Sequence, residues 1–152
     1  MTDENLELSV TRLIDAPVET VWKIVTERME EWWCPQPWTA SIVEQDWRAG
    51  GRSAMVMHGP NGEEMAFEGV FLEVTPGRRF VFTDAFAAGW QPKGPFMVGT
   101  MEFADENGKT RYTGNARHWT REAYEQHKAM GFEPGWAAVA GQLAALAEAE
   151  RA

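Results

Sequence analysis

The sequence MVGTMEFADENGKTRYTGNARHW, residues 97–119, decides the fold of this chain. In both halves of this stretch, small or apolar residues alternate with mostly polar ones, which is the period-2 pattern of a half-buried strand. The pattern predicts strands over Met97–Ala104 and Lys109–Trp119, joined by the turn residues 105–108 (DENG). So short a link between successive strands indicates an antiparallel hairpin.

The chain after this hairpin has a helical pattern. Thr120 can cap a helix start, and Gly131 and Pro134 predict a break or kink near them. Beyond the break we expect a helix over Trp136–Glu150. Its apolar residues are spaced 3, 4 and 3 positions apart, so they form one face that can lie against a sheet: Trp136, Val139, Leu143 and Leu146.

The chain before the hairpin supplies the rest of the sheet. Leu6–Ile14 alternates as a strand, a short helix follows Pro17, and one or two further helical turns precede Pro35. Four more strands are predicted between turn-like segments: Ala40–Asp46, Arg52–His58, Glu64–Val74 and Arg79–Asp84. The longer link Ala85–Pro95 is expected to form a mobile loop at the rim.

This order predicts one α+β domain over residues 1–152. A curved antiparallel sheet wraps around the long C-terminal helix, with the two short helices after the first strand. This arrangement is the helix-grip fold.

Charge and composition narrow the possible partners. The net charge of −9 disfavours nucleic acid and anionic lipid surfaces, and no basic cluster interrupts it. No apolar stretch approaches the roughly 20 residues of a membrane helix, so membrane insertion is not expected. The acidic start at residues 1–5 has no leader-like pattern, and Cys34 is the only cysteine. A cytoplasmic location is therefore expected.

Neither a metal nor a cofactor is expected from the motifs. His58, His118, His127 and Cys34 are the potential soft ligands, but none of them share a metal-site spacing. Phosphate-binding glycine motifs and a nucleophile elbow are absent from the sequence. Cys34 is expected to be a buried small residue rather than a nucleophile.

The inward faces of the predicted strands suggest an apolar pocket against the C-terminal helix. Gly99, Gly114 and Ala116 are small and are expected to leave open volume, while Asp84 and His118 would form a polar end. The predicted ligand-binding residues are Phe80, Phe82, Asp84, Met97, Gly99, Met101, Tyr112, Gly114, Ala116, His118 and Trp136. The alternative is that Trp136 and Val139 fill this space as ordinary core.

Several short motifs in order resemble one known superfamily. They are Asp15-Ala16-Pro17, Val21-Trp22, Trp32-Trp33, Pro35, Gly50-Gly51-Arg52, Gly62, Glu73-Val74-Thr75-Pro76, Arg117-His118-Trp119, Met130-Gly131-Phe132 and Gly135-Trp136. From about Leu6 to Leu146 the chain resembles the SRPBCC (START-like, Bet v 1-like) superfamily. Within it, the chain is similar to domains like the C-terminal part of the heat-shock-protein-90 ATPase activator. The resemblance implies the helix-grip fold, and most members are small bacterial proteins with no assigned reaction.

Three functions remain open at this point. The first is a carrier or sensor that binds an apolar small molecule. The second is an enzyme of cyclase or hydrolase type that uses Asp84 and His118 as acid and base, although both are weak catalytic candidates. The third is a chaperone-associated interaction domain. The chain is expected to be a monomer or a weak homodimer.

Overall fold

The structure, a computed structural model, describes residues 6–93 and 97–151. Its elements follow one another as β1 (Glu7–Ile14), α1 (Val18–Glu27), α2 (Met29–Trp32), β2 (Thr39–Gln45), β3 (Arg52–His58), β4 (Glu64–Thr75), β5 (Arg79–Thr83), β6 (Phe86–Ala87), β7 (Gln91–Pro92), β8 (Met97–Glu106), β9 (Lys109–His118), α3 (Arg121–Ala129) and α4 (Phe132–Arg151). The predicted strands are all present, and their ends move by no more than one or two residues.

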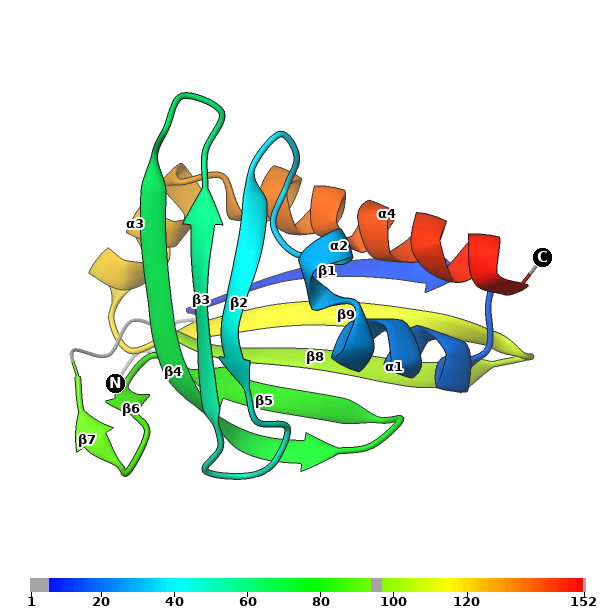
Figure 1. Ribbon diagram of the computed structural model, residues 1–152, viewed down its shortest axis with the longest axis horizontal. Helices are drawn as coiled ribbons and strands as arrows, with labels where there is room; N and C mark the ends of the chain where they lie inside the picture. The colour runs from blue at the N-terminus through cyan, green and yellow to red at the C-terminus, as the bar shows by residue number, and fades with distance from the viewer. Residues whose placement is uncertain (1–5, 94–96, 152) are drawn as a thin grey trace.

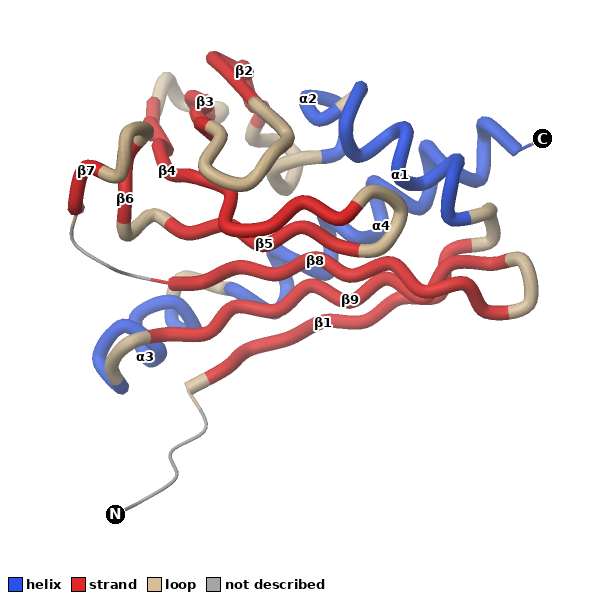
Figure 2. Tube along the Cα trace, turned by 90° about the horizontal axis from the view of Figure 1, so that it is seen from below, coloured by secondary structure: helices blue, strands red, loops and turns tan. Residues whose placement is uncertain are grey.

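Seven strands form one antiparallel sheet in the order β1-β9-β8-β5-β4-β3-β2. The sheet bends, and α4 runs along its inner side together with α1 and α2 (Figure 1). Viewed at right angles, the helices α1, α2 and α4 lie on one side of the sheet, and α3 lies at one end of it (Figure 2). The α+β helix-grip prediction is therefore confirmed.

The hairpin β8–β9 is the longest strand pairing in the sheet. Its ten residue pairs run from Met97 opposite His118 to Glu106 opposite Lys109. The connection consists of Asn107 and Gly108, which both have positive φ, at 56° and 82°. Two successive residues of this kind form the tight turn whose twist matches that of antiparallel strands.

The break between the last two helices lies where the sequence indicates it, but α4 begins earlier than predicted. Gly131 has a φ of +92° and separates α3 from α4, which starts at Phe132 rather than at Trp136. Pro134 falls within the first turn of α4. Proline is tolerated there because the first amide groups of a helix have no partner inside it.

The link expected to be a mobile loop contains a small hairpin instead. Strands β6 and β7 pair with each other, and the ring of Phe86 meets the edge of Trp90 with centroids 5.8 Å apart. The end of this link, Gly94 and Pro95, lies outside the described residues, as does the acidic start at residues 1–5. Among the described residues, no helix has the length and apolar character needed to cross a membrane.

One part of the interior is filled by interlocking rings, which we call the aromatic core: Trp22, Trp47, Phe71, Phe80 and Phe103. Trp47 stacks on Phe71 at 4.7 Å, and Trp22 meets Phe103 edge-on at 5.7 Å. Such offset and edge-to-face pairs add stability beyond the area that they bury. The aromatic core fixes α1 on the sheet.

Candidate functional site

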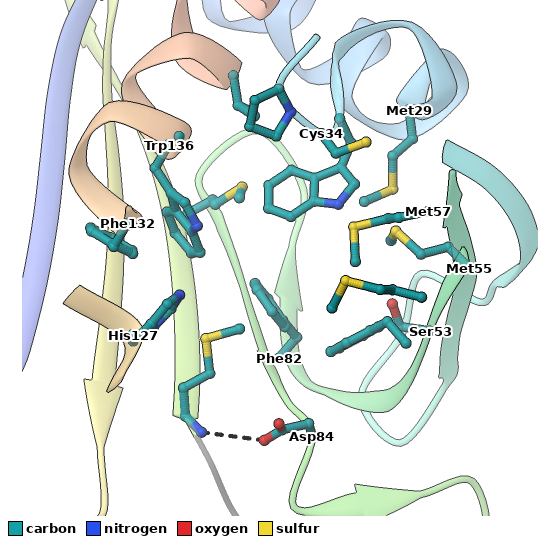
Figure 3. Close-up of a pocket in the computed structure, with 18 of the residues that line it drawn as sticks. Met29, Cys34, Ser53, Met55, Met57, Phe82, Asp84, His127, Phe132 and Trp136 are labelled. Atoms are coloured by element: carbon teal, nitrogen blue, oxygen red, sulfur yellow. Dashed lines mark hydrogen bonds between the residues drawn. The ribbon is translucent and has the colours of Figure 1, made fainter. Parts of the chain in front are cut away.

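A cavity of about 370 Å³ lies between the concave face of the sheet and the first half of α4. Side chains from α2, β2, β3, β4, β5, β8, α3 and α4 surround it (Figure 3). Met65 and Met130 line it and are 48% and 62% exposed, so they mark its mouth. This volume falls within the range of about 300–1,000 Å³ that is usual for small-molecule sites.

Methionines dominate the wall of the cavity. Apart from Met1, which lies outside the described residues, every methionine of the chain lines it. These seven residues come from five separate parts of the chain: Met29, Met55, Met57, Met65, Met97, Met101 and Met130. A methionine side chain is unbranched and polarisable, so it can adapt to the shape of whatever it contacts.

Aromatic rings complete the apolar lining. Trp33 meets Trp136 edge-on with centroids 5.9 Å apart, and Phe132 lies 4.5 Å from Trp136. Phe67 and Phe82 form a further edge-to-face pair at 6.2 Å. The cavity therefore offers both fixed rings and adaptable thioethers to a bound molecule.

Four polar side chains interrupt this lining: Gln45, Ser53, Asp84 and His127. The Ser53 hydroxyl donates to Gln45 Oε1 at 3.0 Å, and Asp84 Oδ1 accepts from the Met97 backbone N–H at 3.2 Å. Among the described residues that line the cavity there is no lysine and no arginine. The site is consequently not built to neutralise an anion.

His127 reaches the cavity from α3 and is bonded to a second histidine. His118 Nδ1 lies 3.0 Å from the Leu6 carbonyl oxygen, and His118 Nε2 lies 2.8 Å from His127 Nδ1. Because a carbonyl only accepts, Nδ1 of His118 carries a proton. In the neutral pair, Nε2 of His118 then accepts from Nδ1–H of His127. Burial, and to a lesser extent the proximity of His118, lower the pKa of His127 to about 4.

Cys34 lies in the wall of the cavity on the loop between α2 and β2. Burial raises the pKa of its thiol above the ordinary value, which keeps it protonated at neutral pH. The loop is held against α4 by Gln142, whose side-chain amide donates to the carbonyls of Trp32 and Cys34, both at 3.0 Å. Cys34 is 3% exposed, so it is the buried small residue that the sequence predicts; its place in the cavity wall was not predicted.

Six of the eleven predicted ligand-binding residues line the cavity: Phe80, Phe82, Asp84, Met97, Met101 and Trp136. The other five, Gly99, Tyr112, Gly114, Ala116 and His118, are outside its lining as the described residues define it. Tyr112 is buried beside Phe103, with ring centroids 5.6 Å apart. His118 stands behind His127 and does not itself reach the cavity wall.

The expectation that the strand glycines leave open volume is wrong. A Cβ added at Gly99 would overlap the ring of Phe82. One added at Gly114 would lie 3.0 Å from Trp136 Cε3 and 2.9 Å from Tyr112 Oη. Neighbouring aromatic side chains occupy the space next to these glycines, and the cavity is instead lined by residues of β3 and β4 as well as β5 and β8.

Sequence reasoning missed Gln45, Ser53, His127 and the five methionines outside β8. The even spacing of Met55, Met57 and Met65 along two adjacent strands was a usable signal, because a hairpin brings such residues to one face. Gln45 carries no such signal, since a β-bulge changes the face to which it belongs.

Comparisons with known proteins agree with this architecture. The family model for Activator of Hsp90 ATPase homolog 1-like protein matches residues 15–148. A solved structure of a protein from Nitrosomonas europaea is 35% identical, covers 99% of both chains and has a TM-score of 0.92. A protein from Mycobacterium smegmatis is 30% identical over 93% of this chain and 90% of its own, with a TM-score of 0.79.

A more distant structure shows the same fold. An AHSA1-like protein from Aeromonas hydrophila is 20% identical over 95% of this chain and 93% of its own, with a TM-score of 0.70. The comparison with curated proteins gave no match.

Proposed function

We propose that this chain, which belongs to the family of Activator of Hsp90 ATPase homolog 1-like proteins, binds an apolar small molecule in its cavity and acts as a carrier or sensor. The observation that carries the proposal is the gathering of seven methionines and several rings around about 370 Å³ of space. In an ordinary core those side chains would contact one another and close the space.

Physical chemistry favours an apolar occupant. Each Å² of apolar ligand surface removed from water contributes roughly 25 cal/mol. The wall around this space is methyl, thioether and aromatic, and its four polar groups are too few to hydrate the whole volume. An apolar molecule would gain contacts here that water cannot provide.

Uptake of an apolar fluorescent dye such as Nile red tests the proposal, with native mass spectrometry to detect a co-purified compound. The substitution Met57→Trp replaces a thioether side chain with a bulkier indole ring in the cavity wall. It should lower dye affinity at least tenfold because it takes up space that the dye would occupy. Val43→Trp is the matched control, because Val43 is 57% exposed and does not line the cavity. Equal dye binding by both variants, or no uptake by the wild-type protein, would refute the proposal.

The chaperone alternative is tested separately in a coupled ATPase assay. The chain has a net charge of −9 and its sequence contains no run of basic residues, so we expect no stimulation of a chaperone ATPase at stoichiometric ratio. A clear stimulation would favour the interaction function instead. The acid–base pair of Asp84 and His118 stays a prediction, and the side chain of that pair in the cavity is Asp84 alone.

A further inference from the structure

The seven methionines around the cavity differ in how far solvent reaches them. Met101, Met55 and Met97 are 1%, 4% and 9% exposed, so they are buried in the wall. Met65 and Met130 are 48% and 62% exposed, although they belong to the same lining. The mouth of the cavity therefore presents thioether groups that a solute in water can reach.

The two exposed methionines come from separate parts of the fold. Met65 lies on β4, where it is paired with Met57 of β3. Met130 is the C-cap of α3, directly before Gly131, which also lines the cavity. Among the described lining residues, the one other exposed residue is Ala66, which has only a methyl side chain. A molecule that enters from solvent therefore meets these two thioethers first.

A thioether is a group that a hydroperoxide can oxidise. A sulfur lone pair attacks one peroxide oxygen, the S–O bond forms as the O–O bond breaks, and water leaves, so the sulfur is oxidised and the peroxide is reduced. The other sulfur type in the wall is less reactive here. Cys34 is 3% exposed, and burial raises the pKa of its thiol, so little of the reactive thiolate is present at neutral pH. Oxidation should begin at Met65 and Met130.

Oxidation changes what the mouth offers to an apolar molecule. Methionine sulfoxide is polar, whereas methionine is apolar. A ligand seated against the sulfoxide oxygen takes water away from it and gives no hydrogen bond in return, which is unfavourable. The described lining contains no lysine or arginine that could donate to this oxygen instead. A sulfoxide at the mouth therefore opposes the binding of an apolar ligand.

We propose that Met65 and Met130 are sites of reversible oxidation by hydroperoxides, and that their sulfoxides lower the affinity of the cavity for its apolar ligand. Methionine sulfoxide reductases return the sulfoxide to the thioether, so the change can be reversed. The inference rests on the proposed binding function and adds a form of regulation to the same site.

The test treats the wild-type protein with increasing amounts of hydrogen peroxide and locates the sulfoxides by peptide mass spectrometry. Met65 and Met130 should be oxidised ahead of the buried lining methionines, in the order of their exposure. The affinity for Nile red should fall about tenfold as these two residues react. Treatment with methionine sulfoxide reductases should restore it.

Paired variants identify which sulfur atoms matter. Met65→Leu with Met130→Leu keeps the mouth apolar without oxidisable sulfur, so its dye affinity should be the same before and after peroxide. The matched control is Met29→Leu with Met57→Leu, which changes two half-buried lining methionines and should lose affinity on oxidation as the wild type does. Met65→Gln with Met130→Gln places a polar amide at the mouth and should weaken dye binding without any oxidant. Thermal melts check that all three variants fold.

The outcomes separate this inference from the function on which it rests. If the other lining methionines react first, if sulfoxides at both mouth positions leave dye affinity unchanged, or if the control variant protects as well as Met65→Leu with Met130→Leu, this inference is wrong and the apolar-ligand function stands. If the untreated wild-type protein takes up no dye, the proposed function fails, and the inference fails with it.

Discussion

The interior of this protein has two regions that are built differently. In the aromatic core under α1, rings meet at centroid distances of 4.7–6.4 Å, and Trp22, Trp47 and Phe103 do not line the cavity. Beside α3 and the first half of α4, seven methionines surround open volume. Phe71 and Phe80 belong to both regions, so they form the boundary between the filled side and the open side.

The difference shows that apolar content alone does not decide whether an interior is closed. A Phe or Trp ring has two rotatable bonds and one rigid shape, so neighbouring rings interlock and hold one another in place. A methionine has three rotatable bonds and fills irregular gaps without a single required partner. A wall of methionines can therefore remain open and still fit different occupants.

The largest expected effects on the free energy of unfolding come from truncating one residue in the aromatic core and one in the methionine wall, and comparing them tests this contrast. Phe103→Ala should cost about 3–5 kcal/mol of unfolding free energy, because Phe103 is 4% exposed and packs against Trp22 and Tyr112. Met55→Ala should cost about 2 kcal/mol although Met55 is equally buried at 4%, because it borders space that is already empty.

The measurement is urea denaturation of both variants, with dye uptake in parallel. Phe103→Ala should leave dye affinity nearly unchanged, while Met55→Ala should change it. Equal losses of stability would mean that the methionine wall is packed as tightly as the aromatic core, and the contrast between the two regions would be broken.

The strand glycines provide a second test of moderate size. Gly114→Ala places a Cβ 3.0 Å from Trp136 and 2.9 Å from Tyr112 Oη, so one of these rings has to shift. Overpacking of this kind costs about 1–3 kcal/mol, and it should appear as a lower melting temperature without loss of the fold.

Gly62→Ala is a poor control for this experiment, because Gly62 has a positive φ of 86°. Ala123→Gly on α3 checks instead that a change of one methyl group elsewhere gives the ordinary helix penalty of about 1 kcal/mol. If Gly114→Ala is neutral or stabilising, the space above Gly114 is open after all.

The sheet and the long helix follow from local patterns, and this explains why they could be predicted. Alternation over residues 97–119 gives strands of known face, and the apolar stripe from Trp136 to Leu146 gives a helix of known face. Two such faces have to bury each other. The start of α4 was misplaced because Pro134 was treated as a breaker, whereas its position in the first turn makes it compatible with the helix.

The site was less accessible to sequence reasoning, for three physical reasons. Glycines on an inward face leave volume that neighbouring rings can occupy, as Phe82 does over Gly99. A β-bulge at Val43 turns the side chain of Gln45 to the opposite face of the sheet from the one that strict alternation predicts, and the sequence carries no pattern that indicates this bulge. His127 meets His118 only because α3 folds back over the end of β9, which depends on the turn between them rather than on their spacing.

The smallest expected effect concerns acidity at the boundary between α3 and the cavity. Burial lowers the pKa of His127 to about 4 in the folded protein, against about 6.5 in the unfolded chain. Between these values the unfolded chain binds more protons than the folded one, so the free energy of unfolding rises with pH. This stability is complete above about pH 6.5 and is lost progressively as the pH falls toward 4.

The measurement is the melting temperature of wild type and of His127→Gln between pH 7 and 5. The side-chain amide of the variant can still donate to His118 Nε2 but does not titrate, so the variant should lose less stability on acidification. Parallel melting curves for the two proteins over that range would show that His127 takes up its proton without cost, and that the wall of the cavity beside it is wetter than its burial indicates.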